Sequence, residues 1–271
     1  MHDDTDCYFT RIDEHRYRPT ERTGGAWSPT EQHISPVIGV MIHEVERFIA
    51  KREPDNLAIT RISVDILGVL SIEDFDIHVD VIRPGKTIEL LEATVTAGGR
   101  HAVRARLWRL SVADTSAVAG GVQPQLVPPE AMDSWDMTQL WPGGYISSLD
   151  VRTAAPPQPG RTTAWVSSDV ALVGNEPASA LAHFVGLVDT ANGVAVRQSP
   201  REWMFPNLDL TIHLFRQPHG KWVGLDTTVV FGTGGQGTTT TTLHDEDGQV
   251  GYASQILTVR SMGRAAARVS A

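Results

Sequence analysis

Cysteine and long apolar stretches are both scarce in this chain of 271 residues. The single cysteine, Cys7, excludes an intrachain disulfide and any metal site built from several cysteines, which fits a reducing compartment. No run of about 18 apolar residues occurs, and the N-terminal Met1–Asp4 lacks the features of a signal peptide. We therefore expect a cytoplasmic protein with no membrane partner.

Positive charge is also in short supply. The chain has 23 Lys and Arg against 32 Asp and Glu, which gives a formal net charge of -9 at pH 7. Binding to nucleic acid without sequence preference needs clustered cations that displace counterions from phosphates. We therefore expect no nucleic-acid partner, and a small molecule or a second copy of the chain remains as the partner.

Several familiar site motifs are missing. The chain has no G-x-S-x-G elbow, which argues against the serine mechanism of α/β-hydrolases. The glycine-rich stretch 232–237 lacks a following helix and a P-loop lysine, so we interpret it as a hairpin turn. Isolated histidines without a ligand pair at helical spacing predict no metal site: His43, His78, His183 and His213.

An internal repeat is the strongest pattern in the sequence. Each half consists of an extended segment, one apolar helix and four strands in the same order. In the first half, Ser35 and Pro36 predict a helix start, and the helix should end before Pro54. In the second half a helix begins near Pro177. The predicted strands cover 59–70, 75–82, 87–95 and 102–110, then 208–215, 222–231, 236–243 and 250–260.

A helix with an apolar stripe must bury it, and an antiparallel sheet wrapped around the helix does so. Two such units predict an α+β architecture with two helices and one shared sheet. We place the first unit at 1–120, a connecting segment at 121–144 and the second unit at 145–271. We expect the connecting region to pack onto the body because it carries Trp135, Trp141 and Tyr145.

The strand-rich stretches 62–110 and 207–260 resemble the bacterial acyl-CoA thioesterase II family. The resemblance rests on the order of the repeat, the Arg83–Gly85 turn and the position of the helix, and it covers roughly residues 8–112 and 145–262. It implies a double hot-dog fold that hydrolyses fatty acyl-CoA with water and no cofactor, using a site in the second unit.

The resemblance also implies three site residues: Asp189 after the helix, Asn207 at the start of a strand and Gln255 on the last strand. Asn207 stands where the family has Thr, and an amide replaces a hydroxyl with a larger planar donor. In this reading Asp189 is the base, and Asn207 and Gln255 orient the water. A backbone N–H near a helix start would stabilise the oxyanion.

The residues by themselves leave alternatives open. Asp189 is also typical of a solvated helix end, and Gln255 alone reads as an outward strand residue. Glu44 and Glu46 occupy the corresponding place in the first unit, where we expect solvated helix residues rather than a second site.

Two other functions remain in competition with the thioesterase. A hot-dog hydratase or dehydratase uses an Asp and a His close together after the helix, but residues 189–200 contain no His. A non-catalytic acyl-CoA-binding protein would keep the tunnel without the chemistry, and the unusual Asn207 is compatible with it. Exposed sheet surface further predicts a homodimer.

Overall fold

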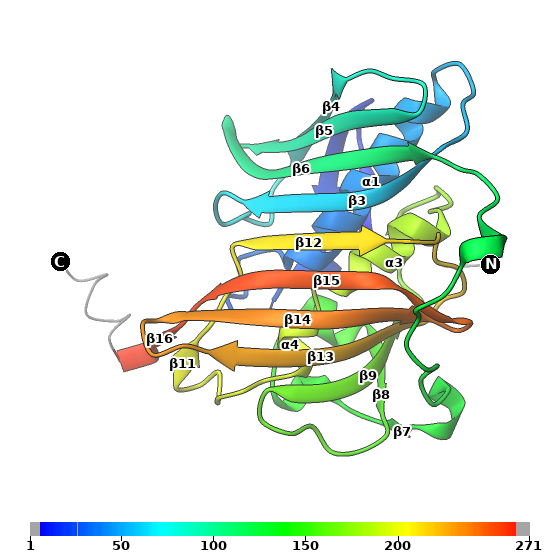
Figure 1. Ribbon diagram of the computed structural model, residues 1–271. Coiled ribbons are helices and arrows are strands. Elements are labelled where there is room, and N and C mark those ends of the chain that lie inside the picture. The colour runs from blue at the N-terminus through cyan, green and yellow to red at the C-terminus, as the bar shows by residue number, and fades with distance from the viewer. Residues whose placement is uncertain (1–5, 26, 264–271) are drawn as a thin grey trace.

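One large sheet and two central helices form the body of the molecule (Figure 1). The computed structural model describes residues 6–25 and 27–263. Helix α1 (Ile34–Ala50) belongs to the first half and α3 (Ala180–Val188) to the second, and both lie behind the strands in Figure 1. Two helices under one shared sheet is the architecture that the repeat predicted.

The sheet has 14 strands in the order β10-β1-β2-β4-β5-β6-β3-β12-β15-β14-β13-β9-β8-β7. The strands of the first half are β1 (Cys7–Arg11), β2 (Arg16–Pro19), β3 (Leu57–Ile66), β4 (Phe75–Arg83), β5 (Ile88–Ala97) and β6 (Arg100–Ser111). Those of the second half are β7 (Asp133–Ser134), β8 (Leu149–Thr153), β9 (Arg161–Ser168), β10 (Ala171–Val173), β12 (Asp209–Leu214), β13 (Val223–Phe231), β14 (Gln236–Asp245) and β15 (Gly248–Thr258).

Shorter elements complete the described chain. A separate two-stranded ribbon pairs β11 (Trp203–Met204) with β16 (Arg260–Ser261). The short helices are α2 (Gly144–Ser147), α4 (Ala191–Val194), η1 (Glu21–Thr23), η2 (Ser116–Val118), η3 (Pro129–Ala131) and η4 (Met137–Gln139).

The two halves are joined at two seams of the sheet. At the centre β3 pairs antiparallel with β12, and near one end β1 pairs parallel with β10. Both seams therefore exchange backbone hydrogen bonds between the halves, while unit boundaries at 120 and 144 stay a prediction.

The helix α1 begins earlier than the sequence suggested. His33, not Ser35, is the N-cap residue, and Ser35 and Pro36 occupy the first turn. Histidine is an uncommon cap, so the familiar Ser-Pro signal dominated the prediction. The helix ends at Ala50, before Pro54, as expected.

The two helices cross where each has a glycine. A Cβ on Gly39 of α1 would lie 2.9 Å from the Cα of Gly186 in α3. Side chains at this point would hold the helices apart, so the glycines permit the close crossing that sets α1 against α3. This crossing fixes how the N-terminus of α1 meets the C-terminus of α3.

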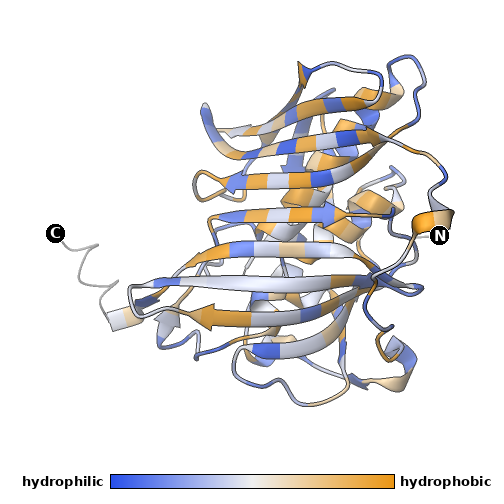
Figure 2. Cartoon of the chain, viewed as in Figure 1, coloured by the Kyte–Doolittle hydropathy of each residue, from blue (hydrophilic) through white to orange (hydrophobic). Residues whose placement is uncertain are grey.

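The predicted strands are present with shifted ends. Blue and orange residues alternate along β3 and β6 in Figure 2, as a half-buried strand requires. The strand predicted at 59–70 ends at Ile66, because the chain turns away at Gly68 and leaves Leu67 and Val69 exposed. The stretch 232–235 is the β13–β14 hairpin turn, as interpreted.

The aromatic region between the halves packs onto the body, as expected. Trp141 and Tyr145 are buried, and the half-buried Trp135 contacts the same apolar core. No helix within the described residues is long and apolar enough to cross a membrane.

Candidate active site

Asp189 lies at the end of α3, where it is the C-cap residue. The helix is apolar on nearly every side, so its end is carried into the core and Asp189 is only 6% exposed. Burial raises the pKa of Asp189 to about 6, an effect larger than the opposing effect of its hydrogen bonds. The reading of Asp189 as a solvated helix end is therefore wrong.

Asn207 and Gln255 both donate to the same oxygen of this carboxylate. Asn207 Nδ2 lies 2.7 Å and Gln255 Nε2 2.8 Å from Asp189 Oδ1. Asn207 precedes β12 and also donates to the carbonyl of Asp209, while Gln255 points inward from β15 and is buried. The three residues inferred from the resemblance thus meet, and the outward reading of Gln255 is wrong.

The second oxygen of the carboxylate is available. Within the described residues no group donates a hydrogen bond to Asp189 Oδ2, and the nearest basic nitrogen, His33 Nδ1, is 3.9 Å away. No cation among these residues neutralises Asp189. The carboxylate is oriented by neutral donors on one side and presents a free lone-pair site on the other.

A cavity of about 310 Å³ opens beside Asp189 and Asn207. Its walls come from both halves: the segment before α1, the loop after β3, the region around Trp141, and the α3–α4 turn. Trp27 stacks edge-on against Trp141 at 4.9 Å between ring centroids and against Phe205 at 5.2 Å, which gives one wall an aromatic lining. The carboxylate therefore borders a largely apolar space formed between the two units.

The N-terminus of α1 also borders this cavity through His33 and Ile34. The first four N–H groups of a helix have no partner within it. Here the N–H of His33 donates to the Thr23 carbonyl, that of Ser35 donates to His33 Nδ1, and Pro36 has none. Among the described residues, Ile34 is left as the first-turn N–H without an acceptor.

His33 is the site residue that sequence reasoning missed. Its ring stacks on Tyr145 with centroids 4.3 Å apart, and burial lowers its pKa to about 3. The available signal was its place directly before an apolar helix, but the neighbouring Ser35-Pro36 pair gave a better-known start motif.

Family models match both halves of the chain. A model of the acyl-CoA thioesterase N-terminal domain matches residues 23–110, and a model of the C-terminal domain matches residues 124–259. The chain belongs to the acyl-CoA thioesterase family. No curated protein matches this family member in sequence.

Solved structures agree with this thioesterase-family chain in fold. A proposed thioesterase from Novosphingobium aromaticivorans is 19% identical with a TM-score of 0.71, covering 93% of this chain and 98% of its own. A hot-dog protein of unknown function from Alicyclobacillus acidocaldarius is 14% identical with a TM-score of 0.72, covering 96% and 98%. The acyl-CoA thioesterase II of Mycobacterium marinum is 14% identical with a TM-score of 0.63, covering 93% and 96%. The fold is an α+β double hot dog.

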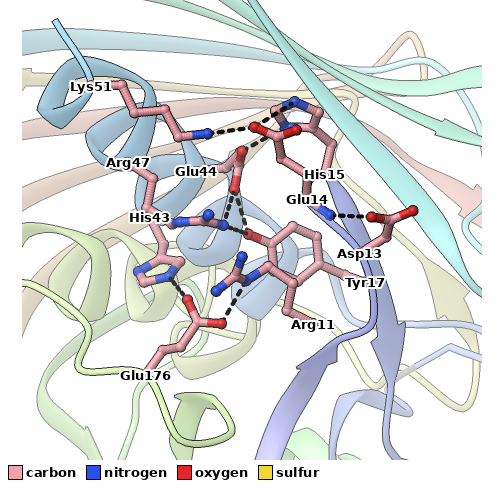
Figure 3. Close-up of polar contacts among 10 residues, drawn as sticks. All are labelled: Arg11, Asp13, Glu14, His15, Tyr17, His43, Glu44, Arg47, Lys51 and Glu176. Carbon is pink, nitrogen blue, oxygen red and sulfur yellow. Dashed lines mark hydrogen bonds and ion pairs between the residues drawn. The ribbon is translucent and has the colours of Figure 1, made fainter.

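The carboxylates of the first unit do not match the solvated residues that we expected. Glu44 is 1% exposed and accepts hydrogen bonds from Tyr17, His15 and Arg47 (Figure 3). Glu46 is half-buried and accepts from Ser179 Oγ at 2.6 Å. The expectation failed because Tyr17 of β2 and the preceding His15 cover Glu44, while Ser179, the N-cap residue of α3, covers Glu46. These contacts come from outside α1, so the periodicity of the helix could not predict them.

Four histidines were noted in the sequence, and none of them lines the cavity. His43 is buried beside Glu176, with His43 Nε2 and Glu176 Oε2 3.1 Å apart (Figure 3). Within residues 6–25 and 27–263 no group of three or more His, Cys, Asp or Glu is placed to hold a metal ion.

Proposed function

We propose that the protein hydrolyses fatty acyl-CoA thioesters by an activated water, with Asp189 as the general base. The observation that carries the proposal is the buried Asp189 carboxylate, held at Oδ1 by two amide donors and free at Oδ2 beside an apolar cavity. A base is most effective when its pKa lies near the working pH, and burial moves the pKa of Asp189 in that direction.

The proposed reaction uses each group in one role. Asp189 Oδ2 accepts a proton from a water while the water oxygen bonds to the thioester carbonyl carbon. The oxyanion that forms is stabilised by the Ile34 N–H at the α1 N-terminus. The carbon–sulfur bond then breaks, and the proton held by Asp189 passes to the leaving CoA sulfur. The products are the free acid and CoA, with no cofactor needed.

In this mechanism Asn207 and Gln255 are positioning residues. Each already directs its amide N–H at Asp189 Oδ1, so they orient the carboxylate and not the water as first expected. The amide of Asn207 supplies the donor that the resembling family supplies with a hydroxyl. This supports retained activity in spite of the replacement.

The cavity supports an acyl group as the substrate. About 310 Å³ lies at the small end of the range for ligand pockets, and the aromatic and aliphatic walls suit a hydrocarbon chain. Leu67 and Val69 in the loop after β3 line this cavity and are exposed, so the CoA portion would remain near the surface at this loop.

The direct test is release of free CoA, followed with a thiol reagent across acyl-CoAs from short to long chain. We expect turnover by the wild type and a loss of at least about 10²-fold in Asp189→Asn, the size of a general-base contribution. Asn has the shape of Asp and still accepts from Asn207 and Gln255, so folding should be kept. Unchanged turnover in Asp189→Asn would move the base elsewhere.

One observation favours the hydratase alternative: His33 of the first half lies close to Asp189, as the Asp and His pair of that mechanism requires. However, His33 Nδ1 already accepts the Ser35 N–H, and the low pKa of the ring leaves it a poor proton carrier. We therefore expect no hydration of an enoyl-CoA. The binding-protein alternative predicts tight binding of acyl-CoA with no CoA released by the wild type.

We also propose a homodimer, because much of the outer face of the sheet is left uncovered in the single chain (Figure 1). The terminal strands β7 and β10 have two and three residues, so they offer little edge for pairing. Light scattering should give about twice the chain mass of 29.5 kDa. A monomer mass at micromolar concentration would contradict this proposal.

A further inference from the structure

His33 has a fixed tautomer because it caps its own helix. Its Nδ1 accepts the backbone N–H of Ser35 at 3.1 Å, so Nδ1 carries a lone pair and not a proton. A neutral imidazole with an unprotonated Nδ1 bears its proton on Nε2. The ring is held in place by the stack on Tyr145, itself fully buried and bonded to Thr190. His33 is therefore a rigid N–H donor.

The donor end of His33 has no other use in the described part of the chain. Nε2 has no hydrogen-bond partner there. It is nevertheless not among the fully buried side-chain nitrogens and oxygens that lack a partner. It therefore keeps contact with accessible space. His33 lines the same cavity as Asp189, Asn207 and Ile34, and its side chain is only 14% exposed. The structure thus places the His33 ring, whose Nε2–H has no partner among the described residues, in the same cavity as the proposed base.

We propose that His33 is a catalytic hydrogen-bond donor whose Nε2–H binds the thioester carbonyl oxygen and stabilises the oxyanion, alongside the Ile34 N–H. This inference rests on the proposed hydrolysis. As water adds, negative charge develops on that oxygen, and a donor already held in place strengthens its bond without reorganising. His33 stays neutral throughout and transfers no proton.

The same geometry excludes His33 as the base. Its only lone pair is taken by the Ser35 N–H, and burial keeps its pKa near 3, so the ring is neutral wherever Asp189 is ionised. A distance of 3.9 Å from Nδ1 to Asp189 Oδ2 is too long for a hydrogen bond. Asp189 and His33 therefore act on different atoms, the first on water and the second on the carbonyl oxygen.

A pair of variants separates catalysis from capping. Ser is a strong N-cap residue, so His33→Ser keeps the α1 cap but loses the ring donor and the stack on Tyr145, whereas His33→Ala loses the cap as well. We expect kcat in His33→Ser to fall about 10²–10³-fold, the usual loss for one oxyanion donor, with KM within about threefold. Both variants lose the packing of the ring, so the Tm of each should fall, and that of His33→Ala should fall further because it also loses the cap. Activity near wild type in His33→Ser with loss in His33→Ala would make His33 a cap only.

A second measurement does not depend on turnover. In protein labelled with ¹⁵N-histidine, long-range ¹H–¹⁵N spectra should show His33 as the Nε2–H tautomer from pH 5 to 8. Adding an S-(2-oxoalkyl)-CoA, a ketone that cannot be hydrolysed at this position, should move the Nε2–H proton downfield. An S-alkyl-CoA without the carbonyl should not. An Nδ1–H tautomer, or equal shifts with both probes, would overturn the inference even if Asp189→Asn confirms hydrolysis. If the wild type released no CoA but the ketone still moved the Nε2–H signal as expected, the result would count against the proposed function alone.

Discussion

The two central helices each bury a carboxylate, and the two carboxylates have opposite surroundings. Glu44 in α1 lies among a tyrosine hydroxyl, a histidine and an arginine, with Arg47 Nη1 3.0 Å from its Oε2 (Figure 3). Asp189 after α3 is held by two neutral amides. The same repeat has thus produced one carboxylate with a cation and one without.

This difference separates a structural group from a chemical one. A cation beside a buried carboxylate stabilises the charged form and satisfies its oxygens, so nothing is left for a substrate. Neutral donors orient Asp189 without removing its affinity for a proton, and burial raises its pKa. The space beside the carboxylate differs as well, because the described cavity borders Asp189 and not Glu44.

The largest effect should come from breaking the Glu44 cluster. Glu44→Ala leaves Tyr17 and Arg47 without their acceptor and opens a void, so we expect a loss of roughly 3–5 kcal/mol in the free energy of unfolding. Urea unfolding measures this loss. The kcat per folded molecule should remain within about threefold of wild type. A stable variant with a large loss of kcat would place Glu44 in a second site.

Removing the charge at Asp189 should have the opposite sign. Folding raises the pKa of Asp189 from 3.8 to about 6, so its stabilising contribution is complete below pH 3.8 and is lost as the pH rises through 6. At pH 8 the ionised group destabilises the fold by up to about 3 kcal/mol. Asp189→Asn should therefore melt higher than wild type at pH 8 and equally at pH 4. A lower Tm at pH 8 would show that the carboxylate is a structural group like Glu44.

The pH dependence of activity should report the same group. Because the base must be ionised, kcat/KM should be constant above pH 6 and fall about tenfold per unit below it. In Asn207→Asp a second carboxylate takes the place of the donor 2.7 Å from Asp189. This should move the acid limb of the profile, the fall in kcat/KM at low pH, to higher pH by about one unit or more. A limb that stays at pH 6 in Asn207→Asp would mean that another group controls the rate.

Much of this contrast could be predicted from sequence, but not all of it. The hydrophobic periods predicted both helices and most strands, and the family resemblance brought Asp189, Asn207 and Gln255 together. Glu44 was misjudged because its partners Tyr17 and His15 lie outside α1, so the pattern of the helix itself gives no sign of them. His33 was missed for a similar reason, since its role needs a cavity that the two halves form jointly.

The smallest effect should come from restoring the family's hydroxyl. Asn207 Nδ2 donates both to Asp189 Oδ1 and to the carbonyl of Asp209, and a threonine with one proton can make only one of these bonds. Loss of one such bond is worth about 1 kcal/mol, so Asn207→Thr should change kcat/KM about three- to fivefold and leave the acid limb at pH 6. Parallel pH–rate profiles of Asn207→Thr and Asn207→Asp test this, since both remove the amide but only Asn207→Asp adds charge. A loss above 100-fold in Asn207→Thr would show that the amide also contacts the substrate, because the loss of one hydrogen bond to the Asp189 carboxylate or to the Asp209 carbonyl explains only about three- to fivefold.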